Sequence, residues 1–107
     1  MMIPQIQPAE LKRMLDAGQP LVLLDVREPD EHAFCALVGS VLIPLGELAA
    51  RVVEVQPDGV PVVVYCHHGV RSLSGAAILI RAGIEAVSLA GGIDRWTLSV
   101  DPDVPRY

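Results

Sequence analysis

The chain has 107 residues, of which 51% are hydrophobic and 20% are charged. This size and balance predict one globular domain with a hydrophobic core, and they exclude a disordered or collagen-like chain. The net charge of −5 argues against nucleic acid or an anionic membrane as the main partner, because both bind surfaces rich in Lys and Arg.

Strand and helix signals alternate along the chain. Apolar runs rich in branched residues predict strands, and apolar residues at helical spacing, closed by glycine or proline, predict the helices between them. The expected strands cover residues 3–7, 21–26, 41–43, 60–65 and 86–89. The expected helices cover residues 8–17, a short segment opening at 29–32, then 45–53 and 71–82.

This alternation predicts an α/β fold with a small, mainly parallel five-stranded sheet and helices on both faces. Residues 1–107 are expected to form a single domain, because no repeat or linker interrupts them. Residues 101–107 are expected to form a flexible C-terminal tail, since Pro102 and Pro105 disfavour regular structure. In sheets of this kind, ligands bind at the carboxyl ends of the strands.

No apolar run reaches the roughly 18 to 20 residues that span a bilayer, and the first residues lack the pattern of a signal peptide. We therefore expect a soluble, cytoplasmic protein whose two cysteines, Cys35 and Cys66, stay reduced. Cys35 lies in an apolar stretch and is interpreted as a buried hydrophobic residue, with a resolving thiol as the alternative.

Cys66 stands just beyond the strongest strand signal and before a helix, in the run Cys-His-His-Gly-Val-Arg-Ser over residues 66–72. Backbone N–H groups of such a loop can converge on an anion, and a helix N-terminus with nearby His and Arg favours a thiolate. Gly69 allows a tight turn, and Arg71 offers a planar set of donors. The sequence therefore predicts Cys66 as a nucleophile. The predicted substrate-binding residues are His67, His68, Gly69, Val70, Arg71 and Ser72.

Four segments in a fixed order carry a family resemblance. They are Leu-Asp-Val-Arg-Glu at 24–28, Ile-Pro-Leu at 43–45, the loop at 66–71, and Gly-Gly-Ile at 91–93 followed by Trp96. In this order the chain resembles the rhodanese family over nearly its whole length. The resemblance implies a single-domain sulfurtransferase in which Cys66 carries sulfur as a persulfide between two displacement steps, with no metal or organic cofactor. It also implies a donor such as thiosulfate or a protein persulfide, and a thiol or cyanide-like acceptor.

The loop length distinguishes this interpretation from a phosphatase. Arg71 lies five positions after Cys66, whereas tyrosine-phosphatase-type loops place Arg one position farther along. The shorter loop suits one sulfur atom better than a phosphate. The chain also departs from the rhodanese pattern, because residues 36–40 lack a basic side chain that relatives usually carry there. Arg71, with His67 or His68, would then supply the local positive charge for an anionic donor.

Several residues have structural alternatives to a functional role. Asp25 and Arg27 are interpreted as a structural pair at a strand end, and Trp96 as a packing residue. A metal site at His67 and His68 is disfavoured, because adjacent residues rarely point at one ion. Ser72 either donates to the persulfide or begins the helix, and the sequence leaves both open.

Three functions are consistent with these residues. The leading one is sulfur transfer from a small donor or protein persulfide, with Cys66 as nucleophile, Arg71 as anion-binding group and the amides of residues 67–71 around the sulfur. The second is a sulfur-relay or regulatory binding module with little activity on free thiosulfate. The third, a phosphatase or arsenate reductase, is disfavoured by the loop length and by the lack of an evident general acid. The physiological donor, the acceptor and the oligomeric state do not follow from the sequence.

Overall fold

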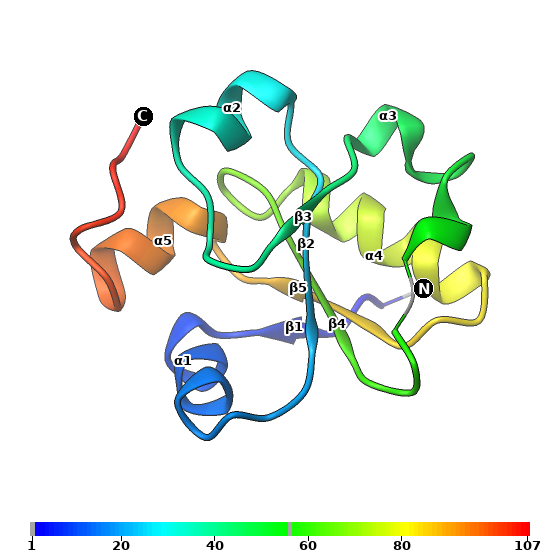
Figure 1. Ribbon diagram of the computed structural model, residues 1–107, viewed down its shortest axis with the longest axis horizontal. Coiled ribbons are helices and arrows are strands. Elements are labelled where there is room, and N and C mark those ends of the chain that lie inside the picture. The colour runs from blue at the N-terminus through cyan, green and yellow to red at the C-terminus, as the bar shows by residue number, and fades with distance from the viewer. Residues whose placement is uncertain (1, 56) are drawn as a thin grey trace.

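The computed structural model describes residues 2–55 and 57–107 and contains a five-stranded sheet (Figure 1). Its strands are β1 (Gln5–Ile6), β2 (Val22–Asp25), β3 (Val41–Leu42), β4 (Val62–Tyr65) and β5 (Ala86–Leu89). They lie in the order β1-β5-β4-β2-β3, and each pair in this sheet is parallel. The predicted α/β fold is confirmed.

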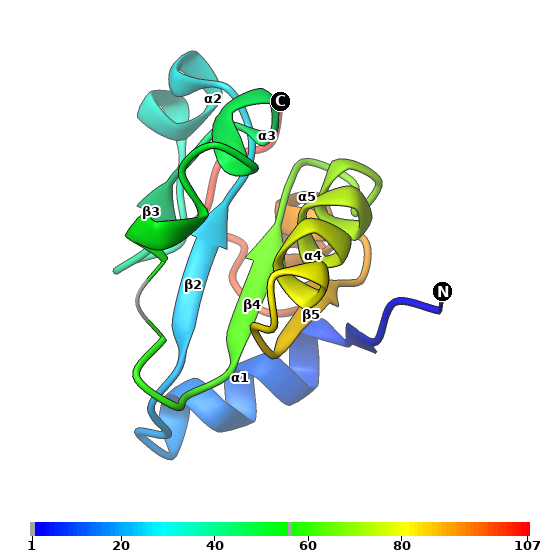
Figure 2. The ribbon, with the colours of Figure 1, turned by 90° about the vertical axis from the view of Figure 1, so that its right-hand side faces the viewer.

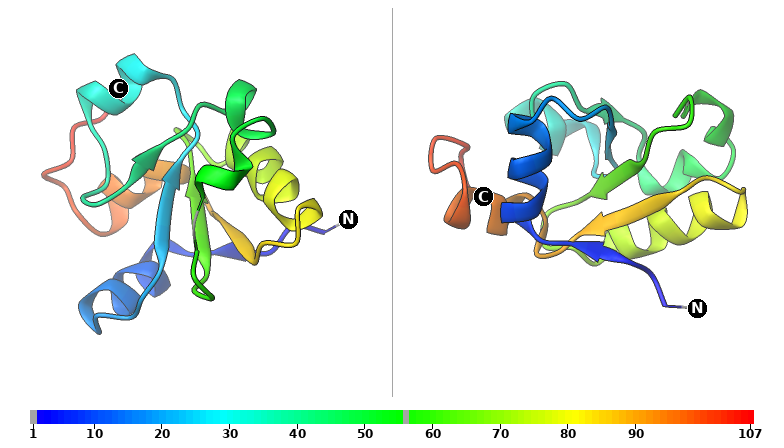
Figure 3. Two further views of the ribbon diagram at one scale, coloured as in Figure 1. Left: turned by 45° about the vertical axis from the view of Figure 1, so that its right-hand side comes forward. Right: turned by 90° about the horizontal axis from the view of Figure 1, so that it is seen from below.

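Helices cover both faces of the sheet, as the views in Figures 2 and 3 show. They are α1 (Pro8–Asp16), α2 (Pro29–Phe34), α3 (Leu45–Leu48), α4 (Arg71–Arg81) and α5 (Gly92–Ser99), with a 3₁₀ turn, η1, at Val52–Glu54. Helices α3 and α4 enclose one hydrophobic core, and α1 and α5 enclose the other. In the part of the chain that the structure describes, no helix has the length and apolar character needed to cross a membrane.

Strand β4 forms the centre of the sheet and is buried along its whole length. Val62 and Val64 pack into the core below α3 and α4, whereas Val63 and Tyr65 pack into the core below α1 and α5. Because both faces are covered, the strand reads as a continuous apolar run rather than an alternating one. Its carboxyl end delivers Cys66 to the N-terminus of α4.

The prediction of one helix over residues 45–53 is wrong for the second half of this segment. Helix α3 ends at Leu48, and the chain turns before η1 begins at Val52. The side chain of Arg51 binds Glu47 and Glu54 across this turn, at 2.9 and 2.8 Å. The β-branched Val52 and its neighbour lower the helix propensity there, and Val52 packs against the core from the turn.

Residues 101–107 have no helix or strand, as Pro102 and Pro105 predicted. They nevertheless make defined contacts, because Val104 packs against the core that contains α5, and Arg106 pairs with Asp94 at 2.9 Å. The tail then returns to the end of the sheet near α2 (Figure 1). Its flexibility in solution stays a prediction.

Candidate active site

The thiol of Cys66 lies in a pocket of hydrogen-bond donors at the junction of β4 and α4. Its Sγ accepts backbone N–H bonds from Gly69 at 3.2 Å and Ser72 at 3.3 Å. It also lies 3.4 Å from the Ser72 hydroxyl, which in turn is 2.8 Å from the hydroxyl of Ser88. Donors arranged in this way stabilise negative charge on sulfur. The residue is only 1% exposed, so its reactive atom is enclosed.

Ser72 lies in the first turn of α4, where its backbone N–H contacts the sulfur, and its donation to a persulfide stays a prediction. Ser88 was not predicted. It is the only polar residue in β5. A single hydroxyl in an otherwise apolar strand is the sequence feature that could have indicated its role. Among the backbone donors expected from residues 67–71, Gly69 contacts Sγ in this structure.

The loop is supported from behind by the N-terminus of α5. The N–H groups of Ile93 and Asp94 donate to the carbonyls of Cys66 and His67, at 2.9 and 3.1 Å. Gly92 has a φ of +63°, and a Cβ atom there would collide with the carbonyl oxygens of Cys66 and His67. The close approach of this glycine to the cysteine loop is a property of the fold.

Arg71, the predicted anion-binding residue, is paired with a carboxylate of the chain itself. Its Nη1 and Nη2 donate to Glu31 Oε1 and Oε2 at 2.7 and 3.0 Å. The Arg71 hydrogen bonds lower the pKa of Glu31 to about 2, and Glu31 raises the pKa of Arg71. An anionic donor would therefore have to compete with Glu31 for this guanidinium.

His67 and His68 follow Cys66 with their rings side by side, their centroids 3.8 Å apart and tilted by 30°. Burial lowers the pKa of His67, and the neighbouring His68 adds to this effect. This lowered pKa favours the uncharged ring of His67 and so limits the positive charge that it can supply to an anionic donor. Val70 is 72% exposed, and its role in substrate binding stays a prediction.

The possible metal ligands His67, His68 and Asp94 have donor atoms within 4.8 Å of one another. The carboxylate of Asp94 already pairs with Arg106 at 2.9 Å, and this pair lowers the pKa of Asp94. The ring of His67 also stacks on the ring of Tyr107, with centroids 3.8 Å apart. The absence of a metal stays a prediction.

Asp25 and Arg27 form the structural pair that the sequence indicated. Both are fully buried, and Arg27 Nη2 donates to Asp25 Oδ2 at 2.7 Å and to the carbonyl of Cys35 at 2.6 Å. Cys35 and Trp96 are buried in the same hydrophobic core, as predicted. The bonds of Arg27 thereby hold the end of β2 against the residue that follows α2.

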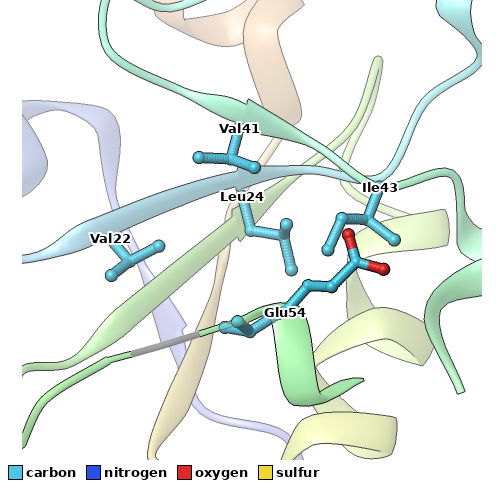
Figure 4. A pocket seen from close by; sticks show the side chains of 6 residues that line it. Val22, Leu24, Val41, Ile43 and Glu54 are labelled. Atoms are coloured by element: carbon cyan, nitrogen blue, oxygen red, sulfur yellow. The ribbon is translucent and has the colours of Figure 1, made fainter. Parts of the chain in front are cut away.

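A separate apolar pocket of about 200 Å³ lies between β2, β3 and η1, and Figure 4 shows its lining. Leu24, Val41 and Ile43 supply apolar walls, and Glu54 lies at one side with its carboxylate bound to Arg51 at 2.8 Å. None of the described lining residues belongs to the Cys66 loop. The pocket therefore does not contribute to the chemistry of this cysteine.

The arrangement of an enclosed cysteine, a strand end and a helix N-terminus agrees with a comparison against known families. The sequence model of the rhodanese-like domain matches residues 7–99. The chain belongs to the rhodanese-like domain family. This match includes the Cys66 loop and the supporting turn at Gly92.

Curated relatives of this rhodanese-like domain include longer proteins. MoeZ of Mycobacterium tuberculosis, named a probable adenylyltransferase/sulfurtransferase, is 39% identical over 95% of this chain and 26% of its own length. YrkF of Bacillus subtilis, proposed by its name to be a sulfur carrier protein, is 33% identical over 89% of this chain and 51% of its own length. The chain thus spans a quarter to a half of these proteins, and it is homologous to domains of sulfurtransferase and sulfur-carrier proteins.

Solved structures show the same fold. A thiosulfate sulfurtransferase from Pseudomonas aeruginosa has a TM-score of 0.86 and 33% identity, covering 97% of this chain and 20% of that one. A rhodanese-related protein from Thermoplasma volcanium has a TM-score of 0.81 and 30% identity, covering 97% of this chain and 99% of that one. The rhodanese-like fold is therefore found both as a short chain and as part of a longer one.

The ion pair between Glu31 and Arg71 predicts a pH-dependent contribution to the stability of this rhodanese-like domain. Because folding lowers the pKa of Glu31 from its ordinary value of 4.5 to about 2, the pair stabilises the fold fully above pH 4.5. This contribution is lost as the pH falls toward 2. The side chains of Glu31 and Arg71 are 16% and 35% exposed, so we expect Glu31→Gln to cost about 1 to 2 kcal/mol at pH 7.

Urea unfolding of the wild type and Glu31→Gln from pH 7 down to pH 2 measures this effect. The difference in unfolding free energy between the two proteins should shrink below pH 4.5. In this range the charged Glu31 carboxylate stabilises the wild type progressively less. Glu10→Gln, at an exposed position of α1, is the matched control and should show little difference at any pH. A gap that stays constant down to pH 2 would contradict the pairing.

Proposed function

We propose that this rhodanese-like domain is a sulfurtransferase that carries sulfane sulfur as a persulfide on Cys66. The observation that supports this most directly is the environment of Sγ, which receives two backbone N–H bonds and faces the Ser72 hydroxyl. Such donors stabilise a thiolate before the reaction and a persulfide anion after it. Relatives named as sulfurtransferases support the same chemistry.

The proposed reaction has two displacements. In the first, the Cys66 thiolate attacks the outer sulfur of the donor, so that a bond from Sγ to this sulfur forms and the donor's own bond to it breaks. The donor leaves with the electron pair, as a thiolate from a persulfide or as sulfite from thiosulfate. In the second, an acceptor thiolate or cyanide attacks the outer sulfur and releases the Cys66 thiolate. The transfers need no external oxidant or reductant.

The pairing of Arg71 favours a protein persulfide over free thiosulfate as the donor. A small dianion gains its binding energy from positive groups, but Arg71 is bound by Glu31, and the lowered pKa of His67 favours its uncharged ring. A protein donor brings its own contact surface and depends less on these charges. The predicted cytoplasmic location would keep Cys66 reduced and ready to accept sulfur.

Intact-protein mass spectrometry tests the proposal. Reduced protein is incubated separately with thiosulfate and with a donor protein whose surface thiol has been converted to a persulfide. We expect a gain of one sulfur atom that dithiothreitol reverses and that peptide mapping assigns to Cys66, with the protein donor more effective than thiosulfate. A Cys35→Ser variant is the matched control, because it keeps Cys66 as its only thiol.

Two results would overturn the proposal. One is that neither donor adds sulfur to the wild type. The other is that the wild type hydrolyses an aryl phosphate at a rate that depends on Cys66, which would favour the phosphatase alternative. Efficient loading from the protein donor, together with negligible loading from thiosulfate, would identify the domain as a sulfur relay within the same chemistry.

A further inference from the structure

The side chain of Tyr107 lies against the Cys66 loop, although the two are far apart in the sequence. Its ring stacks on the ring of His67, with centroids 3.8 Å apart and planes at 7°. Its hydroxyl accepts a hydrogen bond from Arg27 Nη1 at 2.8 Å and donates one to Glu31 Oε2 at 2.8 Å. Figures 1 and 3 show the tail returning to α2, the helix that carries Glu31.

These contacts connect Tyr107 to both ends of the loop. His67 is the first residue after Cys66, and Glu31 pairs with Arg71, the first residue of α4. The ring therefore covers the start of the loop, while the hydroxyl binds the carboxylate that pairs with its end. Cys66 is 1% exposed, whereas Tyr107 is 43% exposed and contacts His67, the residue next to this enclosed thiol.

Displacing the Tyr107 hydroxyl would leave neither of its two side-chain partners, Glu31 and Arg27, without a hydrogen bond. Glu31 would keep both bonds from Arg71 and the N–H of Glu28 at 2.9 Å. Arg27 would keep its bonds to Asp25 and to the carbonyl of Cys35. The free-energy cost of moving Tyr107 away from the loop is therefore limited to the contacts of Tyr107 itself. No buried charge is left unpaired.

We infer that Tyr107 is a specificity-determining residue that limits the size of the molecule able to reach Cys66. The inference deepens the proposed function and rests on it for the identity of the substrates. A small acceptor such as cyanide meets the outer sulfur, which extends about 2 Å beyond Sγ, without moving the ring. A bulky thiol has to separate Tyr107 from His67 and Glu31, whereas a partner protein can replace these contacts with its own.

Access to the unmodified thiol provides a test that involves no sulfur transfer. The full chain is alkylated with N-methylmaleimide and with the bulkier N-cyclohexylmaleimide, and peptide mapping assigns the rate to Cys66. We expect Tyr107→Ala to accelerate the bulky reagent roughly tenfold and the small one less than about twofold, because both the stack and the hydroxyl bonds are lost. Tyr107→Phe keeps the stack and should give roughly a threefold increase with the bulky reagent.

Leu98→Ala is the matched control, since it shortens another exposed apolar side chain, on α5, and should change neither rate. An equal acceleration of both reagents by Tyr107→Ala, or no acceleration of the bulky one, would overturn the inference. On persulfide-loaded protein, the same variant should speed transfer to glutathione more than transfer to cyanide. If the wild type does not take up sulfur on Cys66, the proposed function fails. The acceleration of the bulky maleimide relative to the small one still decides the role of Tyr107.

Discussion

A Cys66→Ser variant is expected to fold like the wild type and to lose sulfur transfer by a factor of about 10⁴ or more. The serine hydroxyl is not ionised at neutral pH and does not form a stable persulfide, so both displacement steps are removed. The N–H groups of Gly69 and Ser72 can still bind its oxygen, and we expect a change in stability of about 1 kcal/mol or less. Steady-state transfer to cyanide and urea unfolding measure the two effects.

Cys35→Ser is the control for this result, because Cys35 is the second thiol of the chain and packs in the core containing Trp96. It should retain transfer activity even where its stability is reduced. Substantial activity in Cys66→Ser, with loss of activity in Cys35→Ser, would move the nucleophile to Cys35 and refute the proposed mechanism.

Gly92→Ala is expected to reduce sulfur transfer by about 100-fold and to destabilise the domain by about 3 kcal/mol or more. The added Cβ would meet the carbonyl oxygens of Cys66 and His67, and the positive φ adds a strain of about 1 to 2 kcal/mol. The loop would have to move away from α5, which would break the bonds from Ile93 and Asp94 and displace Sγ from its donors. Persulfide loading and urea unfolding report the two consequences.

Gly83→Ala is the control that separates the strain of a positive φ from the collision of the added Cβ atom. Gly83 also has a positive φ, of +85°, but a Cβ atom there would meet nothing within 4 Å. This variant should lose about 1 to 2 kcal/mol of stability and keep the transfer rate of the wild type. If Gly92→Ala behaved in the same way as Gly83→Ala, the close packing of α5 against the cysteine loop would not be important for the reaction.

The sequence by itself determined the features that depend on local pattern. Apolar runs of branched residues identified the buried strands, including β4, because a strand covered on both faces requires apolar side chains along its length. The same pattern placed Cys66 between a strand and a helix, where parallel sheets bind ligands. It failed over residues 45–53, where packing of Val52 and the side-chain bonds of Arg51 favoured a turn over a continuous helix.

Only the tertiary structure decided which distant groups surround the sulfur. Arg71 is paired with Glu31 from another helix, and Tyr107 from the tail stacks on His67. Burial of the His67 ring lowers its pKa, and no local sequence pattern indicates this burial. The hydroxyl of Ser88 reaches Ser72 because β5 lies beside β4. Side chains meet in this way when crossovers bring strand ends together, and helical or strand periodicity carries no information about such partners.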